Sequence, residues 1–274
     1  MKISLIQMNS IHDKAANIAA ARALIEKAVA EEGPDWILLP EQFDWAGGVK
    51  GDKARNAETL PGGPAYAMAR ELAARHRVFI HAGSLMERIE GEERIHNTTV
   101  VFDRDGAEIA RYRKIHLFDV TTPDGASYRE SATVKPGDAV VTYDCEGVTI
   151  GCSICYDLRF PALFQALADK GAQVIALPAA FTLQTGKDHW ETLLRARAIE
   201  TQTYVCAAAQ TGSYSVNNET RQTYGHSLVA DPWGHVVAKA SDGPGVISAR
   251  LDMGHVERVR RMIPVAAHRR GIFA

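Results

Sequence analysis

Short apolar runs alternate along the chain with longer segments that repeat apolar residues at helical spacing. Residues 2–7 and 36–39 are runs of strand length, and apolar side chains recur every three or four positions over 14–31. The runs predict two buried strands, and the longer segment predicts an amphipathic helix between them. Gly33-Pro34 is a typical helix-ending pair.

The same alternation continues through the rest of the chain. We predict further helices over 64–75, 161–170, 188–201 and 253–262, and strands near 78–86, 97–103, 107–112, 139–143, 148–155, 173–178, 203–209, 225–230, 235–240 and 245–250. Arg104-Asp-Gly106 between two strand-like runs indicates a hairpin. Asp188 and Glu191 have the spacing of a capping box, which predicts a helix start at Asp188.

This order of elements predicts one α/β domain over residues 1–274. Because several neighbouring runs look like hairpins, we expect the sheets to be mixed rather than purely parallel. Residues 119–138 are rich in turn-forming residues and weakly periodic. We interpret that segment as a functional loop region rather than a linker.

Composition narrows the classes of partner. Of 274 residues, 46% are hydrophobic and 23% charged, and the net charge is −2, which favours neither nucleic acid nor an anionic membrane as a partner. No stretch approaches the roughly 20 apolar residues of a membrane span. The apolar run in the first residues is too short for the core of a signal peptide. Four cysteines in this setting suggest free thiols in a reducing compartment, so we expect a cytoplasmic protein, with a mitochondrial form still open.

Cys155 follows an apolar run and is the first candidate for chemistry. Several interpretations compete. A buried core cysteine is the commoner fate of a free thiol. The Cys152–Cys155 pair suggests a redox or zinc motif, but residues three apart on a strand point to opposite faces, and no second C-x-x-C completes a zinc site. Gly151-Cys-Ser153 resembles a nucleophile elbow, although the last glycine is missing.

Two other apolar stretches also end in polar side chains. Glu41 follows 36–39, and Lys114 follows 107–112. Each alone is compatible with an ordinary surface charge. The apolar residues around Glu41 would partly desolvate it, which suits a general base. A nucleophile, a base and a cation at three strand ends are the parts of a covalent hydrolase.

These segments also resemble a known family. Leu39–Phe43, Tyr112–His116 and Cys155–Pro161 are similar to the three catalytic blocks of the nitrilase superfamily of carbon–nitrogen hydrolases. Similarity to its Nit branch extends to 178–181, 185–186, 189–200, 224–227 and 231–234. Within that branch, Arg195–Gln202 and His268-Arg-Arg270 are more similar to the deaminated glutathione amidases than to the omega-amidases.

The resemblance implies a fold and a set of roles. The fold is a four-layer αββα sandwich, in which two mixed sheets pack face to face with helices outside, and members usually form homodimers. Cys155 is implied as the nucleophile, Glu41 as the general base and Lys114 as the oxyanion-stabilising cation. Glu130 matches a second glutamate that supports the lysine, in a loop that departs from the family pattern in length and composition.

The expected chemistry adds further residues. A backbone N–H after Cys155, that of Tyr156, would share the oxyanion with Lys114. Arg159 matches an arginine that contacts a substrate carboxylate in carbamoyl-hydrolysing relatives; the alternative is a structural salt bridge to Asp157 or Glu130. The resemblance also implies substrate contacts for Phe181 and Thr185.

Several functions remain open from the sequence. The leading one is an amidase acting on a small ω-amide, such as deaminated glutathione or a related α-keto ω-amide, with no metal or organic cofactor. Alternatives are an omega-amidase acting on 2-oxoglutaramate or 2-oxosuccinamate and a carbamoyl-amine hydrolase. A non-enzymatic scaffold is disfavoured, because Glu41, Lys114 and Cys155 are all present.

Overall fold

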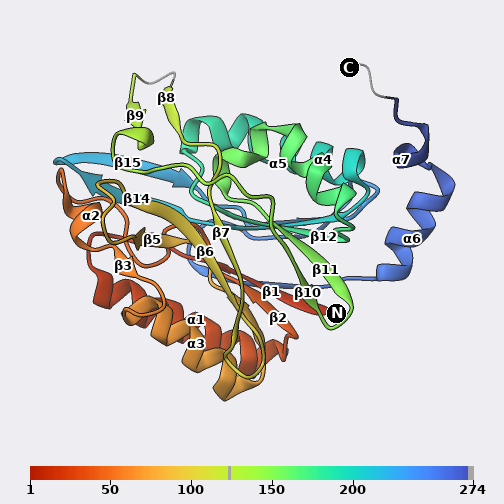
Figure 1. Cartoon of the computed structure of the whole chain (residues 1–274), viewed down its shortest axis with the longest axis horizontal. Helices are drawn as coiled ribbons and strands as arrows, with labels where there is room; N and C mark the ends of the chain where they lie inside the picture. Colours follow the sequence, from red (N-terminus) through yellow and green to blue (C-terminus); the bar gives the residue numbers. More distant parts are fainter. Residues whose placement is uncertain (123–124, 271–274) are drawn as a thin grey trace.

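The chain folds into two large sheets that lie between two layers of helices (Figure 1). A computed structural model describes residues 1–122 and 125–270. The first sheet contains, in spatial order, β18 (Gly245–Arg250), β1 (Lys2–Gln7), β2 (Trp36–Leu38), β4 (Phe79–His81), β6 (His96–Phe102), β5 (Leu85–Arg88) and β3 (Glu58–Thr59), with β7 (Glu108–Arg113) paired to β6. The second contains β10 (Thr142–Cys145), β11 (Val148–Cys152), β12 (Val174–Ala179), β13 (Tyr204–Ala209), β16 (Leu228–Ala230) and β17 (Val236–Lys239).

Side chains along the central strands point alternately to the two faces of the sheet, and this explains the layers. Trp36 and Leu38 of β2 belong to the apolar core that the first sheet shares with the second. Ile37, between them, points to the other face and packs in a separate core with residues of α1 (Lys14–Glu32) and α3 (Pro64–His76). Because neighbouring residues of a strand face opposite ways, a continuous apolar run is buried on both sides.

The second sheet has the corresponding arrangement. Its parallel strands β11, β12 and β13 are covered on the outer face by α4 (Pro161–Asp169) and α5 (Leu183–Thr201) (Figure 1). The predicted αββα sandwich with mixed sheets is therefore confirmed. The sheets are also linked at one end, where the Met8 N–H, just beyond β1, donates to the carbonyl of Ala209 in β13 at 3.4 Å. In the described part of the chain, no helix is long and apolar enough to cross a bilayer.

Two predicted boundaries were wrong near the second sheet. The strand predicted to reach Cys155 ends at Cys152, because the Asp157 carboxylate accepts the Ile154 N–H at 2.8 Å and draws the chain into a 3-10 turn. The long helix α5 begins at Leu183 rather than Asp188. Its first turn carries little apolar periodicity, and packing against the neighbouring strand holds it instead.

Other boundaries differ in the first half of the chain and in the loops. The run predicted over 78–86 forms two strands, separated at Gly83, which has a φ of 44° and lies against the Pro40 carbonyl. The strand predicted near 139–143 forms at Thr142–Cys145. The segment 119–138 contains β8 (Asp119–Thr121), β9 (Ser127–Arg129) and the 3-10 turn η1 (Glu130–Ala132); its residues 123 and 124 lie outside the described residues.

A polar hairpin was missed altogether. It consists of β14 (Thr211–Val216) and β15 (Glu219–Tyr224), which pair with each other and form a separate two-stranded sheet (Figure 1). Its strands lack a regular apolar face, so no strand signal marks them. The short helices α2 (Asp52–Arg55) and α7 (Val265–His268) were also missed, whereas α6 (Met253–Met262) is where the pattern predicts a helix.

Gly186 provides a test of how the hairpin is held against α5. A Cβ at this position would lie 2.3 Å from the Tyr224 Cβ, which belongs to β15 and cannot rotate away. We expect Gly186→Ala to lower the free energy of unfolding by about 1–3 kcal/mol, measured by denaturant titration. The control is Gly245→Ala, where a Cβ meets nothing within 4 Å. Equal stability of the two variants would contradict this packing.

Candidate active site

A cavity of about 510 Å³ opens beside the ends of the central strands. This volume lies in the range of small-molecule sites, roughly 300–1,000 Å³. Every site residue predicted from the sequence lines it: Glu41, Lys114, Glu130, Cys155, Tyr156, Arg159, Phe181 and Thr185. Side chains that are far apart in the sequence therefore meet at one place.

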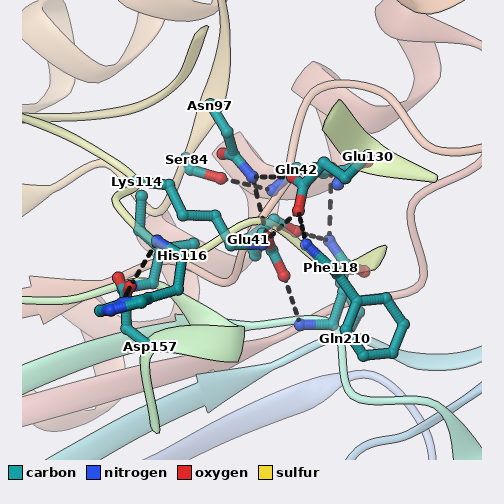
Figure 2. Close-up of polar contacts among 12 residues, drawn as sticks. Glu41, Gln42, Ser84, Asn97, Lys114, His116, Phe118, Glu130, Asp157 and Gln210 are labelled. Atoms are coloured by element: carbon teal, nitrogen blue, oxygen red, sulfur yellow. Dashed lines mark hydrogen bonds and ion pairs between the residues drawn. The ribbon is translucent and has the colours of Figure 1, made fainter. Parts of the chain in front are cut away.

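Glu41 lies just beyond β2 and is 2% exposed. Its Oε1 accepts hydrogen bonds from Asn97 Nδ2 at 2.9 Å and from Lys114 Nζ at 3.0 Å, and its Oε2 accepts from the Ala180 N–H at 2.9 Å (Figure 2). Three donors on one buried carboxyl group satisfy both of its oxygens and fix its orientation.

Lys114 follows β7 and is buried between two carboxylates. Its ammonium lies 3.0 Å from Glu41 Oε1 and 2.9 Å from Glu130 Oε2 (Figure 2). Burial alone would lower the pKa of Lys114, but Glu130 and Glu41 raise it well above its ordinary value. Burial likewise opposes the ionisation of Glu130, but Lys114 and Lys53 together hold its pKa below the ordinary value. Lys114 is therefore a permanent buried cation.

Cys155 is the first residue of the 3-10 turn η2 (Cys155–Arg159), with a φ of 46°. This left-handed conformation is uncommon for a residue with a side chain and is maintained by its surroundings. Asp157 provides the support: it is fully buried and accepts from the Tyr112 hydroxyl at 2.7 Å and from the His116 N–H at 3.1 Å, in addition to Ile154. The turn that begins at Cys155 is thus attached to the segment that carries Lys114.

Burial, followed by the negative charge of Glu41, raises the pKa of the Cys155 thiol well above its ordinary value, against the opposing effect of Lys114. The free enzyme therefore holds a protonated thiol beside Glu41. Burial also raises the pKa of Cys145 to about 12 and the pKa of Cys152 and Cys206 further. Those three cysteines do not line the cavity.

The competing interpretations of this segment are not supported by the geometry. All four cysteines are free. Ser153 is fully buried, donates to the Ala176 carbonyl at 2.8 Å and does not line the cavity, so it is not placed as a nucleophile. In the described residues, no group of three or more His, Cys, Asp or Glu side chains could hold a metal ion.

Arg159 does not make the salt bridge considered as its structural alternative. Its guanidinium nitrogens lie 3.3 Å from His189 Nδ1, and its Cζ lies 5.4 Å from the centre of the Phe181 ring. Among the described residues it forms no ion pair with Asp157 or Glu130. Within residues 1–122 and 125–270, Arg159 therefore lines the cavity without a carboxylate partner.

Sequence reasoning missed two residues that organise the site. The side-chain amide of Asn97, on β6, donates to both Glu41 and Glu130. The backbone carbonyl of Asn97 accepts from the backbone N–H of Lys114 at 2.9 Å. Asp157 fixes the turn that begins at Cys155, as described above. A signal for Asn97 exists in the sequence, since an amide inside an apolar strand needs buried partners. The signal for Asp157 is weaker, because aspartate is common in turns.

Comparison with known proteins identifies the family. Residues 2–261 match the model of the carbon-nitrogen hydrolase family. The chain belongs to that family. It is 41% identical to a deaminated glutathione amidase of Synechocystis, over 96% of each chain. Its fold is similar to that of Saccharomyces cerevisiae Nit3, a member of branch 10 of the nitrilase superfamily, with a TM-score of 0.88 and 32% identity over 100% of this chain and 97% of the other.

This carbon-nitrogen hydrolase is also 41% identical to the nitrilase and fragile histidine triad fusion protein NitFhit of Caenorhabditis elegans. The match covers 98% of this chain but spans 60% of the length of the fusion protein. The crystal structure of NitFhit gives a TM-score of 0.87 over 98% of this chain and 65% of that one. The predicted membership of the nitrilase superfamily and its Nit branch is confirmed.

Thiol labelling tests the assignment of Cys155. We expect the native protein to take up one equivalent of N-ethylmaleimide, because only Cys155 combines a cavity position with access from solvent. Intact-mass spectrometry should show no uptake in Cys155→Ala and unchanged uptake in Cys152→Ala, with labelling rates that rise with pH because the thiol pKa is raised. Loss of labelling in Cys152→Ala while it stays folded would contradict the assignment.

Proposed function

We propose that this hydrolase cleaves the ω-amide of deaminated glutathione, or of a closely related α-keto amide, through a thioester on Cys155. One observation carries the proposal: Lys114 is held between Glu41 and Glu130 in the cavity that also contains Cys155. The similarity to the deaminated glutathione amidase of Synechocystis supports the choice of substrate.

The first half of the reaction forms the thioester. Glu41 takes the thiol proton while the Cys155 sulfur attacks the amide carbon. The oxyanion that develops is stabilised by Lys114 Nζ and by the Tyr156 N–H, which lies in the first turn of η2, where intrahelical acceptors are lacking. Glu41 then protonates the departing nitrogen, and the carbon–nitrogen bond breaks.

The second half hydrolyses the thioester. Glu41, again ionised, takes a proton from water, and the resulting hydroxide attacks the thioester carbon. The Cys155 sulfur leaves and recovers its proton from Glu41. With deaminated glutathione the departing nitrogen is the amine of cysteinylglycine, and the acid released is 2-oxoglutarate. A primary amide would instead release ammonia.

The product distinguishes this function from its alternative. An omega-amidase acts best on 2-oxoglutaramate and releases ammonia, whereas the proposed enzyme should show a higher kcat/KM on deaminated glutathione and release cysteinylglycine. Glu41→Gln should keep the fold and lose acylation, by about 10²–10⁴-fold in rate, because the amide accepts no proton. Mass spectrometry of the quenched enzyme checks the missing thioester; near-normal acylation in this variant would refute the role of Glu41.

The assembly and location of the protein stay predictions. We infer a homodimer or a higher homo-oligomer, a cytoplasmic location, and a single functional domain over residues 1–274, of which 123–124 and 271–274 lie outside the described residues. The family resemblance supports the inferred assembly, and the four free thiols support the inferred location.

Arg159 tests how the acyl end of the substrate is held. A guanidinium grips a carboxylate with two parallel hydrogen bonds, and a lysine cannot reproduce that geometry. We expect Arg159→Lys to raise KM about tenfold for amides that carry an α-keto carboxylate, equivalent to roughly 1.4 kcal/mol, and to affect a neutral amide much less. Equal losses on both amides, together with a lower Tm, would show that Arg159 supports the fold instead.

A further inference from the structure

Lys53 is a second cation in the cavity, and the mechanism does not use it. It belongs to α2, is half-buried and lines the cavity. Burial lowers the pKa of Lys53, while the nearby charges of Glu130 and Glu41 oppose that effect. Within residues 1–122 and 125–270, its ammonium forms no hydrogen bond and no ion pair. A recessed ammonium without a direct partner is costly unless a ligand supplies the opposite charge.

Arg221, on β15, also has a hydrogen-bond donor without a partner in the described structure. Its side chain is 14% exposed, and its Nη2 lies 2.8 Å from the Glu219 carboxylate, which is itself largely exposed. The guanidinium Cζ lies 4.8 Å from the centre of the Tyr128 ring. The buried Nη1, in contrast, has no hydrogen-bond partner in the described structure, although Arg221 lines the cavity. An orphaned guanidinium donor in a cavity is suited to an anionic group.

Both cations are carried by elements that are bonded to each other. The loop before α2 meets the β14–β15 hairpin: the Gly48 N–H donates to the Ser215 carbonyl at 2.8 Å, and the Asn217 N–H donates to the Gly48 carbonyl at 3.0 Å. Gly47 permits the approach, because a Cβ there would lie 2.2 Å from the Ser215 carbonyl oxygen. Figure 1 shows α2 beside this hairpin. This wall is distinct from η2 and α5, which hold Arg159.

The proposed substrate has two carboxylates, one at each end of the scissile amide. Arg159 is assigned to the α-keto carboxylate of the acyl part, and one cation suffices there. We propose that Lys53 and Arg221 form a second anion-binding subsite, which holds the carboxylate of the leaving amine. For deaminated glutathione this is the carboxylate of glycine. The inference rests on the proposed function and extends it, since a substrate that releases ammonia has no such group.

The test compares deaminated glutathione with its C-terminal carboxamide, which differs only in the charge at the leaving end. The unmodified enzyme should have a KM about tenfold lower for the carboxylate, and Lys53→Met and Arg221→Gln should each remove most of that preference. In both variants the rise in KM should fall on the carboxylate, so that its KM approaches the KM of the carboxamide. Lys53→Met also removes a positive charge near Glu130, so any effect of that loss on kcat should be common to the carboxylate, the carboxamide and 2-oxoglutaramate. Lys53→Arg should retain the preference, because it keeps the charge.

Lys50→Met is the matched control. It removes the same charge from an exposed residue at the same cavity, three positions away, and should leave the preference intact. If Lys50→Met removes the preference for the carboxylate to the same extent, the preference comes from the total positive charge around the cavity and not from a subsite. An unmodified enzyme that does not distinguish the two compounds, or variants that raise both KM values equally, would also refute the subsite.

A binding measurement tests the second subsite independently of the proposed hydrolysis. Calorimetry on Cys155→Ala, which cannot turn over, should show tighter binding of deaminated glutathione than of its carboxamide, and loss of the difference when Lys53→Met is added. Absence of hydrolysis by the unmodified enzyme would refute the proposed function, whereas binding without a difference would refute only the second subsite. Melting temperatures of all variants identify any loss of folding.

Discussion

The buried ion cluster of Glu41, Lys114 and Glu130 is the constraint on which the rest of the structure depends. Removing three charges from water is expensive, and their mutual attraction compensates only when the geometry is exact and other donors complete the hydrogen bonds. Here Asn97 donates to both carboxylates, and the Ala180 and Phe118 N–H groups complete them. These donors come from both sheets and from the loop between them, so assembly of the sandwich and assembly of the cluster are coupled.

The strand ends that carry this cluster could be predicted from the sequence, because their pattern is local. Apolar runs that stop at Glu41 and Lys114 mark buried strands followed by charged groups, and the structure brings both into one cavity. Cys155 was placed correctly in the site but wrongly on the strand. The 3-10 turn that carries it depends on Asp157, whose partners Tyr112 and His116 are more than 40 residues away.

The rest could not be predicted because its signals are non-local. The β14–β15 hairpin covers a cavity instead of a core, so its residues lack the apolar alternation that marks a strand. The first residue of α5 has no side-chain cap in front of it, and Gly186 in its first turns lies close against Tyr224 of the hairpin. Lys53 resembles any surface lysine in the sequence, and only the folded arrangement places it near Glu41 and Glu130.

The β14–β15 hairpin, which lines one side of the cavity, affects how the substrate choice of such an enzyme can change in evolution. Glu41 and Lys114 directly follow strands of the first large sheet. The strands β14 and β15, in contrast, pair only with each other and join the body through a few backbone contacts, such as that between Thr211 and Met8. Replacements in the hairpin can therefore alter the shape and charge of the cavity without disturbing the buried ions. The proposed catalytic groups and the proposed determinants of substrate choice are therefore carried by different parts of the fold, so one set can change in evolution while the other is retained.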